Sequence, residues 1–261
     1  MNDQNPLPPV SAQLPPPIPP VLPAGQPRRL GDDPSERLAI PNVVVAIEAI
    51  LRQPRRVMFQ LRQPGAGHLI AMMLSLSVVC SLIYGVVVGT FSGGVQLWAA
   101  PVKIASGLMI SALICLPSLY IFTCLSGSRA RLVEIFGLLA GLLMLMTILL
   151  IGFAPVAWIF SQSTESLPWM GTLHLAFWFI ATIFGLRFLE AGFSNSEARS
   201  RAGLNTWVVI FLLVAVQMTT ALRPILGTAD TILPTGKKFF LAHWGACLSA
   251  ENNAPASRSR N

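Results

Sequence analysis

A few ionisable and amide side chains interrupt the long apolar stretches of this sequence, and they are the residues that could do chemistry there. Near one end of these stretches lie Lys103, His174, Gln217 and Arg223. Charged groups are expensive inside apolar segments, so they call for a functional hypothesis. Lys103 and Arg223 are predicted to form one basic notch that binds a lipid phosphate or a partner's carboxylate, and Gln217 is predicted to lie deeper. The alternative is that both cations extend to lipid headgroups and that His174 is a hydrogen-bonding group at a helix end.

A second set of charged residues lies near the opposite ends of the same stretches: Glu134, Arg187 and Glu190. Glu134 and Arg187 are predicted to form an ion pair between two helices. The alternative for Arg187 is again a side chain that extends to the headgroups.

The sequence lacks the motifs of common enzyme classes. It has no HExxH zinc motif, no GxGxxG or GxxxxGK[ST] phosphate loop and no GxSxG nucleophile motif. The histidines lie in separate segments and the cysteines show no paired spacing: His68, His174, His243, Cys80, Cys115, Cys124 and Cys247. The sequence therefore predicts no catalytic residue, no cofactor and no metal site, and the cysteines are expected to act as small apolar residues.

Composition places most of the chain in lipid. Hydrophobic residues make up 53% of the sequence and charged residues only 11%, and the mean hydropathy is +0.63. A water-soluble fold of this size could hardly cover itself with polar surface. The net charge of +7 comes from basic residues at the edges of apolar runs. That pattern indicates anionic lipid headgroups rather than nucleic acid.

Five stretches are predicted to cross a membrane as helices: 69–89, 99–127, 133–158, 173–188 and 204–225. At about 1.5 Å of rise per residue, about 20 residues cross a hydrocarbon layer about 30 Å thick. The stretch 99–127 is the predicted centre of the organisation, because it continues after Lys103 without another charge. The predicted fold class is therefore all-α, a polytopic transmembrane bundle of about five spans.

Small residues and prolines indicate how these helices pack. Small residues repeat every four positions on two spans, as Ser77, Ser81, Gly85 and Gly89 on one and as Gly137 and Gly141 on another. Such residues let helices approach each other closely in a membrane. Structural kinks are expected at Pro101, Pro117, Pro155 and Pro224.

The orientation follows from the basic residues of the connections. Several arginines precede the first span, Arg129 and Arg131 follow the second, and Arg199 and Arg201 follow the fourth. The first and third connections carry no lysine or arginine. Because basic connections stay in the cytoplasm, the N-terminus is predicted to be cytoplasmic. Five spans then place the C-terminus outside, and the basic residues of the tail conflict with that placement.

Residues 1–40 contain about half of the chain's 21 prolines and are predicted to form a disordered cytoplasmic arm. The arm is either a spacer or, through PLPP and PPPIPP, a ligand for an aromatic groove on a partner.

Residues 41–64 are predicted to form an amphipathic, basic, interfacial segment that is broken at Pro54. Its apolar residues recur at helical spacing, and Arg55 and Arg56 are expected to contact anionic headgroups. The alternative is a solvated helix packed on the rest of the chain. The five-span domain then covers residues 65–227, and residues 228–261 form a C-terminal tail.

Three motifs, FSGGVQLWAAPVK, LPSLYIFTCLSGS and QMTTALRPILG, resemble a widespread group of uncharacterised bacterial multi-pass membrane proteins. That group is similar in outline to the Yip (Ypt/Rab-interacting protein) membrane domain, a five-span bundle with a cytoplasmic N-terminal arm. The resemblance covers residues 42–227, and it is carried by Pro101, Lys103, Pro117, Ser118, Tyr120, Gln217, Arg223 and Pro224. It implies a shared bundle in a bacterial inner membrane and, by likeness to Yip proteins, a non-catalytic partner role. After Gly227 the sequence departs from the expected ending.

The sequence thus favours a non-enzymatic membrane protein that organises the membrane or assembles with a membrane complex. Its predicted partners are anionic lipid headgroups and another membrane protein or a second copy of the chain, without nucleic acid. The second hypothesis is a small transporter or permease-like subunit. In that case Lys103, Gln217 and Arg223 line a polar path, and Pro117 and Pro155 break helices near it.

Overall fold

The regular structure of the described residues is entirely helical. This computed structural model describes residues 29–92, 94–128, 130–164, 167–194 and 202–221. Four helices in that part of the chain are long and apolar enough to cross a membrane: α3 (Ala66–Ser92), α4 (Gln96–Leu125), α5 (Leu132–Ser163) and α6 (Leu167–Ser194). The others are η1 (Pro34–Arg37), α1 (Val43–Arg52), α2 (Pro54–Leu61) and α7 (Ala202–Ala221). The predicted all-α fold class is therefore confirmed for the described residues, with four helices of membrane-spanning length.

The predicted spans correspond to α3, α4, α5 and α6, and the stretch 204–225 corresponds in part to α7. α5 and α6 extend beyond the predicted apolar stretches through polar residues such as Ser161, Gln162 and Glu190. Ser161 donates its hydroxyl to the carbonyl of Trp158 at 2.7 Å, so it fits a helix end without needing water. The predicted proline-rich arm up to residue 28, Arg223, Pro224 and the tail lie outside the described residues.

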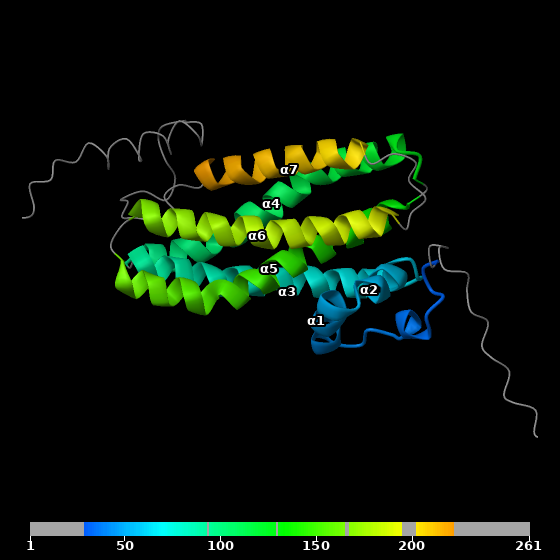
Figure 1. Ribbon diagram of the computed structural model, residues 1–261, viewed down its shortest axis with the longest axis horizontal. Coiled ribbons are helices and arrows are strands. Elements are labelled where there is room, and N and C mark those ends of the chain that lie inside the picture. The colour runs from blue at the N-terminus through cyan, green and yellow to red at the C-terminus, as the bar shows by residue number, and fades with distance from the viewer. Residues whose placement is uncertain (1–28, 93, 129, 165–166, 195–201, 222–261) are drawn as a thin grey trace, which may run out of the picture.

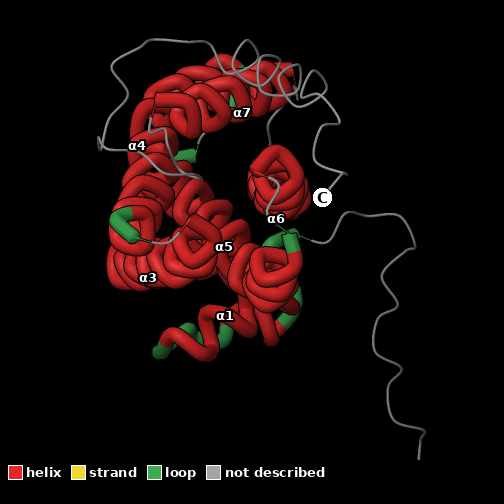
Figure 2. Tube along the Cα trace, turned by 90° about the vertical axis from the view of Figure 1, so that its left-hand side faces the viewer, coloured by secondary structure: helices red, strands yellow, loops and turns green. Residues whose placement is uncertain are grey.

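The long helices form a curved row in the order α6, α5, α3, α4 and α7, each packed on its neighbours. Figure 2 looks along these helices and shows α5 in the middle of the arrangement. In Figure 1 consecutive long helices run in opposite directions, so α3, α5 and α7 begin at the end of the bundle that carries α1 and α2. This end carries Arg62, Arg131 and Arg187, and we call it the basic end.

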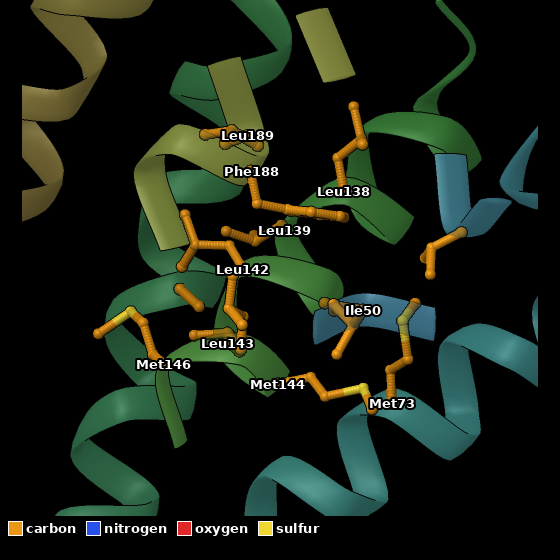
Figure 3. Close-up of a cluster of buried hydrophobic side chains, with 14 of the residues drawn as sticks. Ile50, Met73, Leu138, Leu139, Leu142, Leu143, Met144, Met146, Phe188 and Leu189 are labelled. Carbon is orange, nitrogen blue, oxygen red and sulfur yellow. The ribbon is translucent and has the colours of Figure 1, made fainter. Parts of the chain in front are cut away.

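The central helix is α5, and the expectation that 99–127 organises the bundle is wrong. In the most apolar window of α5, 72% of the residues are buried, compared with 28–33% in α3, α4 and α6. α5 is apolar on every side, which is typical of a helix surrounded by protein. Its core side chain Leu139 lies beside Phe188 of α6 (Figure 3), and Leu142 and Met146 face Gly185 of the same helix. α4 lies further out, between α3 and α7.

Glycines bring the helices into close contact, as the small-residue spacing predicted. A Cβ atom built on Gly85 of α3 would lie 2.3 Å from the Cα atom of Pro101 in α4. One built on Gly141 of α5 would lie 2.5 Å from the ring of Phe188. Ser77 and Ser81 are also buried. These contacts confirm the predicted packing faces on α3 and α5.

The prolines predicted as kinks lie within continuous helices where the structure describes them. Pro101 and Pro117 are inside α4, and Pro155 is inside α5. Close to Pro117, the carbonyl of Cys115 accepts the indole N–H of the buried Trp207 in α7 at 2.9 Å. This bond and the close approach of Gly203 to Phe122 hold α7 on α4.

The segment before the spans forms two short helices that break at Pro54, as predicted. The Asn42 side chain caps α1 by accepting the N–H of Val45 at 2.9 Å. The buried residues are Ala46, Ala49 and Ile50 of α1 and Val57, Met58 and Leu61 of α2. They pack on α3 and α5, so these faces of the segment belong to the core of the bundle.

Candidate functional site

Arg55 and Arg56, the predicted headgroup contacts, bind the chain that precedes them. Arg55 pairs through Nε with the buried carboxylate of Glu36 in η1, and its Nη2 donates to the carbonyl of Arg29 at 3.0 Å. Arg56 donates to the carbonyls of Leu38 and Ala39 at 2.9 and 2.6 Å. Both arginines thus hold residues 29–39 on α2, and contact with headgroups stays a prediction.

A tight turn completes this clamp. Gly31 has a φ of +95°, and its N–H donates to the Glu36 carboxylate at 2.5 Å. A Cβ atom at position 31 would lie 2.6 Å from the ring of Phe59 in α2. The positive φ and the aromatic ring together require glycine there. We call residues 29–39 with α2 the N-terminal clamp.

Charged residues also join α2 to the start of α5. The Glu134 carboxylate lies 3.2 Å from Nε of Arg131 and 3.9 Å from Nε of Arg62. The predicted pair between Glu134 and Arg187 is therefore wrong. Arg187 is exposed on α6 instead, where the side chain can reach toward headgroups.

Inside the bundle, His174 of α6 forms a polar contact that the sequence did not reveal. Its Nδ1 atom lies 2.8 Å from the hydroxyl of Tyr84 in α3. Tyr84 is buried, and the rings meet edge to face with centroids 5.7 Å apart. Among the described residues, Nε2 of His174 has no hydrogen-bond partner. A tyrosine inside an apolar span was the available signal, because a buried hydroxyl needs a partner.

Lys103, one of the two residues of the predicted notch, lies on α4, and Gln217, which was predicted to lie deeper, is on α7, which packs on α4. The side chain of Lys103 is only 5% exposed. The oxygen of the Gln217 amide is buried and meets no hydrogen-bond donor from the described part of the chain. α4 and α7 run antiparallel, and Gly203 of α7 contacts Phe122 of α4. Counting the same number of residues along both helices from this contact puts Gln217 level with about residue 108 of α4. Lys103 then lies about 8 Å from this level, toward the end of the bundle where α4 begins. Arg223 lies outside the described residues.

Exposed tryptophans mark the end of the bundle opposite to the basic end. Trp98 lies at the start of α4, Trp158 near the end of α5 and Trp169 at the start of α6, and all are exposed. Tryptophan is enriched where membrane and water meet. Lys103 and His174 each follow one of these tryptophans by five residues in sequence, which is about 7–8 Å along a helix. They therefore lie slightly deeper than this tryptophan belt.

No metal site is formed by the residues that the structure describes, since no three His, Cys, Asp or Glu side chains come together there. Cys80 and Cys115 are buried, Cys124 is exposed, and Cys247 lies outside the described residues.

Comparison with known proteins leaves function to be inferred from the residues of this chain. No family model, no curated protein and no solved structure matches it.

Proposed function

We propose that the chain is a non-enzymatic, multi-pass membrane protein that organises the membrane or assembles with a membrane complex. The observation that carries this proposal is the N-terminal clamp, which joins the chain from Arg29 onward to the basic end of the bundle. Residues 1–28 therefore leave from a fixed point, which suits an arm that reaches a partner. In the described parts of α3 to α7 the carboxylates are Glu134 and Glu190, both toward the basic end, which also favours a role without acid–base chemistry.

We further propose that α7 is the fifth span and that the N-terminus is cytoplasmic, in a bacterial inner membrane. α7 has 20 residues, lies along α4 and is mostly apolar, and that length is about 30 Å of helix. The basic end carries Arg62, Arg131 and Arg187, whereas the tryptophan belt lies opposite, and this asymmetry favours a cytoplasmic basic end. We propose the resemblance to the Yip membrane domain because of this five-span arrangement with a cytoplasmic N-terminus and because of the three motifs quoted above.

The second candidate function is a small transporter or permease-like subunit. Two observations favour it: Lys103 is buried, and Gln217, about 8 Å deeper along the helices, has a buried amide oxygen that lacks a donor among the described residues. Polar groups of this kind within apolar helices are typical of substrate paths. An anion would be the matching substrate.

One purification and one flux measurement separate the two functions. The full chain is purified from membranes in mild detergent, and bound proteins and lipids are identified by mass spectrometry. The expected result is a stoichiometric protein partner or a second copy, lost when residues 2–28 are deleted and unaffected by an inert tag at the C-terminus. The proposal is contradicted if the chain purifies alone and reconstituted vesicles show an anion flux that Arg223→Leu abolishes.

A further inference from the structure

Helix α1 is apolar on two sides, and only one of them is used within the chain. Ala46, Ala49 and Ile50 are buried against the bundle. Figure 3 shows Ile50 beside Met73 of α3 and Met144 of α5. The hydrophobic burial of this face fixes where α1 lies.

The other side of α1 presents an apolar edge to the surroundings. Val44 is 74% exposed and Leu51 is 49% exposed, and their spacing of two helical turns puts them on one edge. Glu48 and Arg52 lie on the adjacent edge, with Oε1 of Glu48 3.7 Å from Nη1 of Arg52. An apolar edge beside a charged edge is the pattern of a helix that lies in a membrane interface.

The direction of α1 agrees with such a position. Figure 1 shows α1 lying across the long helices, and Figure 2, which looks along those helices, shows α1 from the side. If the long helices cross a bilayer, α1 lies roughly in the plane of the membrane. A helix in that plane can keep one edge in the acyl chains and the other at the headgroups over its whole length.

The depth of α1 can be counted from the tryptophan belt. Ile50 meets Met144, and along α5 from Met144 to Trp158 the distance is about 21 Å. On α6 the corresponding distance, from Trp169 to the exposed Arg187, is about 27 Å. A hydrocarbon layer is about 30 Å thick, so the first count puts Ile50 of α1 in the inner half of that layer, and the second puts Arg187 of α6 close to its inner boundary.

We propose that α1 is inserted into the inner leaflet, with Val44 and Leu51 among the acyl chains and the pair of Glu48 and Arg52 at the headgroups. This inference rests on the proposed membrane crossing of α3 to α6. It moves the lipid contact of the N-terminal segment from Arg55 and Arg56, which hold the N-terminal clamp, to the exposed edge of α1.

Nitroxide labels test this placement in the full chain. Cys124 and Cys247 are replaced by serine, which leaves the buried Cys80 and Cys115. Val44→Cys, Leu51→Cys and the control Glu48→Cys are then labelled one at a time. Ile183→Cys, on the exposed face of α6, is the reference for lipid. Each protein is reconstituted in vesicles of phosphatidylcholine and phosphatidylglycerol, and its accessibility to oxygen and to a water-soluble nickel chelate is measured.

Labels at positions 44 and 51 are expected to match the label at position 183, with high accessibility to oxygen and several-fold lower accessibility to nickel than at position 48. The inference is overturned, while the membrane crossing stands, if nickel reaches positions 44 and 51 but not 183. It is also overturned if neither reagent reaches 44 and 51, because protein then covers the edge. If nickel reaches position 183 as well, the proposed membrane crossing fails together with the inference.

Discussion

The Tyr84 hydroxyl lies 2.8 Å from Nδ1 of His174 and links α3 to α6, two helices that each pack mainly on α5. In an apolar bundle such a bond fixes how the two helices face each other. The bond is compatible with either neutral tautomer of the imidazole, because the hydroxyl can donate to Nδ1 or accept from it. Either way one atom, Nε2, is left without a partner among the described residues.

Tyr84→Phe is expected to destabilise the bundle by about 1–3 kcal/mol, because it leaves neither nitrogen of the His174 imidazole with a partner among the described residues. The measurement is chemical unfolding in detergent micelles. Tyr120→Phe is the matched control, since Tyr120 is exposed on α4. The double variant Tyr84→Phe/His174→Phe tests whether the two side chains are coupled. If His174→Phe lowers the free energy of unfolding by the same amount with and without Tyr84→Phe, the coupling is contradicted.

Glu36→Gln is expected to open the N-terminal clamp, because it removes the charge that pairs with Arg55 inside the turn. Hydrogen bonds to charged groups contribute about 1.5–3 kcal/mol, and the lower part of that range applies because Arg55 is partly exposed. Tryptic cleavage after Arg37 should become faster, while unfolding of the bundle stays nearly unchanged. Glu48→Gln breaks only an exposed pair and should leave cleavage at Arg37 as in the original chain.

Gly85→Ala is expected to destabilise the contact of α3 with α4 by about 1–3 kcal/mol or more, because the new methyl group would meet the backbone of Pro101. Thermal unfolding in detergent measures the effect. Gly152→Ala in α5 is the control, since nothing lies within 4 Å of a Cβ atom there. Equal stability of the two variants would show that α3 and α4 do not approach as closely as described.

Trp207→Phe is expected to loosen α7 from α4 by about 1–2 kcal/mol, because it removes the indole donor to the Cys115 carbonyl and leaves a smaller ring. α7 packs mainly on α4, so its opening should be local. Hydrogen exchange should rise in α7 and stay slow in α5. Trp98→Phe, an exposed change, should alter neither helix.

Val95→Cys and Arg131→Cys should react with a membrane-impermeant thiol reagent on opposite sides of the membrane, because one helix, α4, separates the two positions. In intact spheroplasts the cysteine at 95 should be labelled and the one at 131 only after lysis. A chain without added cysteines serves as the background. Labelling of both positions from one side would reject the proposed threading.

Local features were predictable because they depend on neighbouring residues. The helical state of the apolar stretches, the break at Pro54 and the close approach at Gly85 and Gly141 all follow from composition and spacing. The fifth span and the proline-rich arm remain predictions, since α7 is described only up to residue 221 and the chain only from residue 29.

Tertiary structure alone decided which faces meet. The sequence favoured the stretch of α4 as the centre, whereas α5 is the buried helix. It also paired Glu134 with Arg187, whereas Glu134 lies beside Arg62 and Arg131. The pairing of Arg55 with Glu36 was not apparent from the sequence. The pairing of Tyr84 with His174 was equally hidden. The physical reason is that acyl chains and neighbouring helices are equally apolar, so the polarity of a span does not tell which side faces protein. The sequence by itself therefore determined what the helices are, and only packing determined what each of them touches.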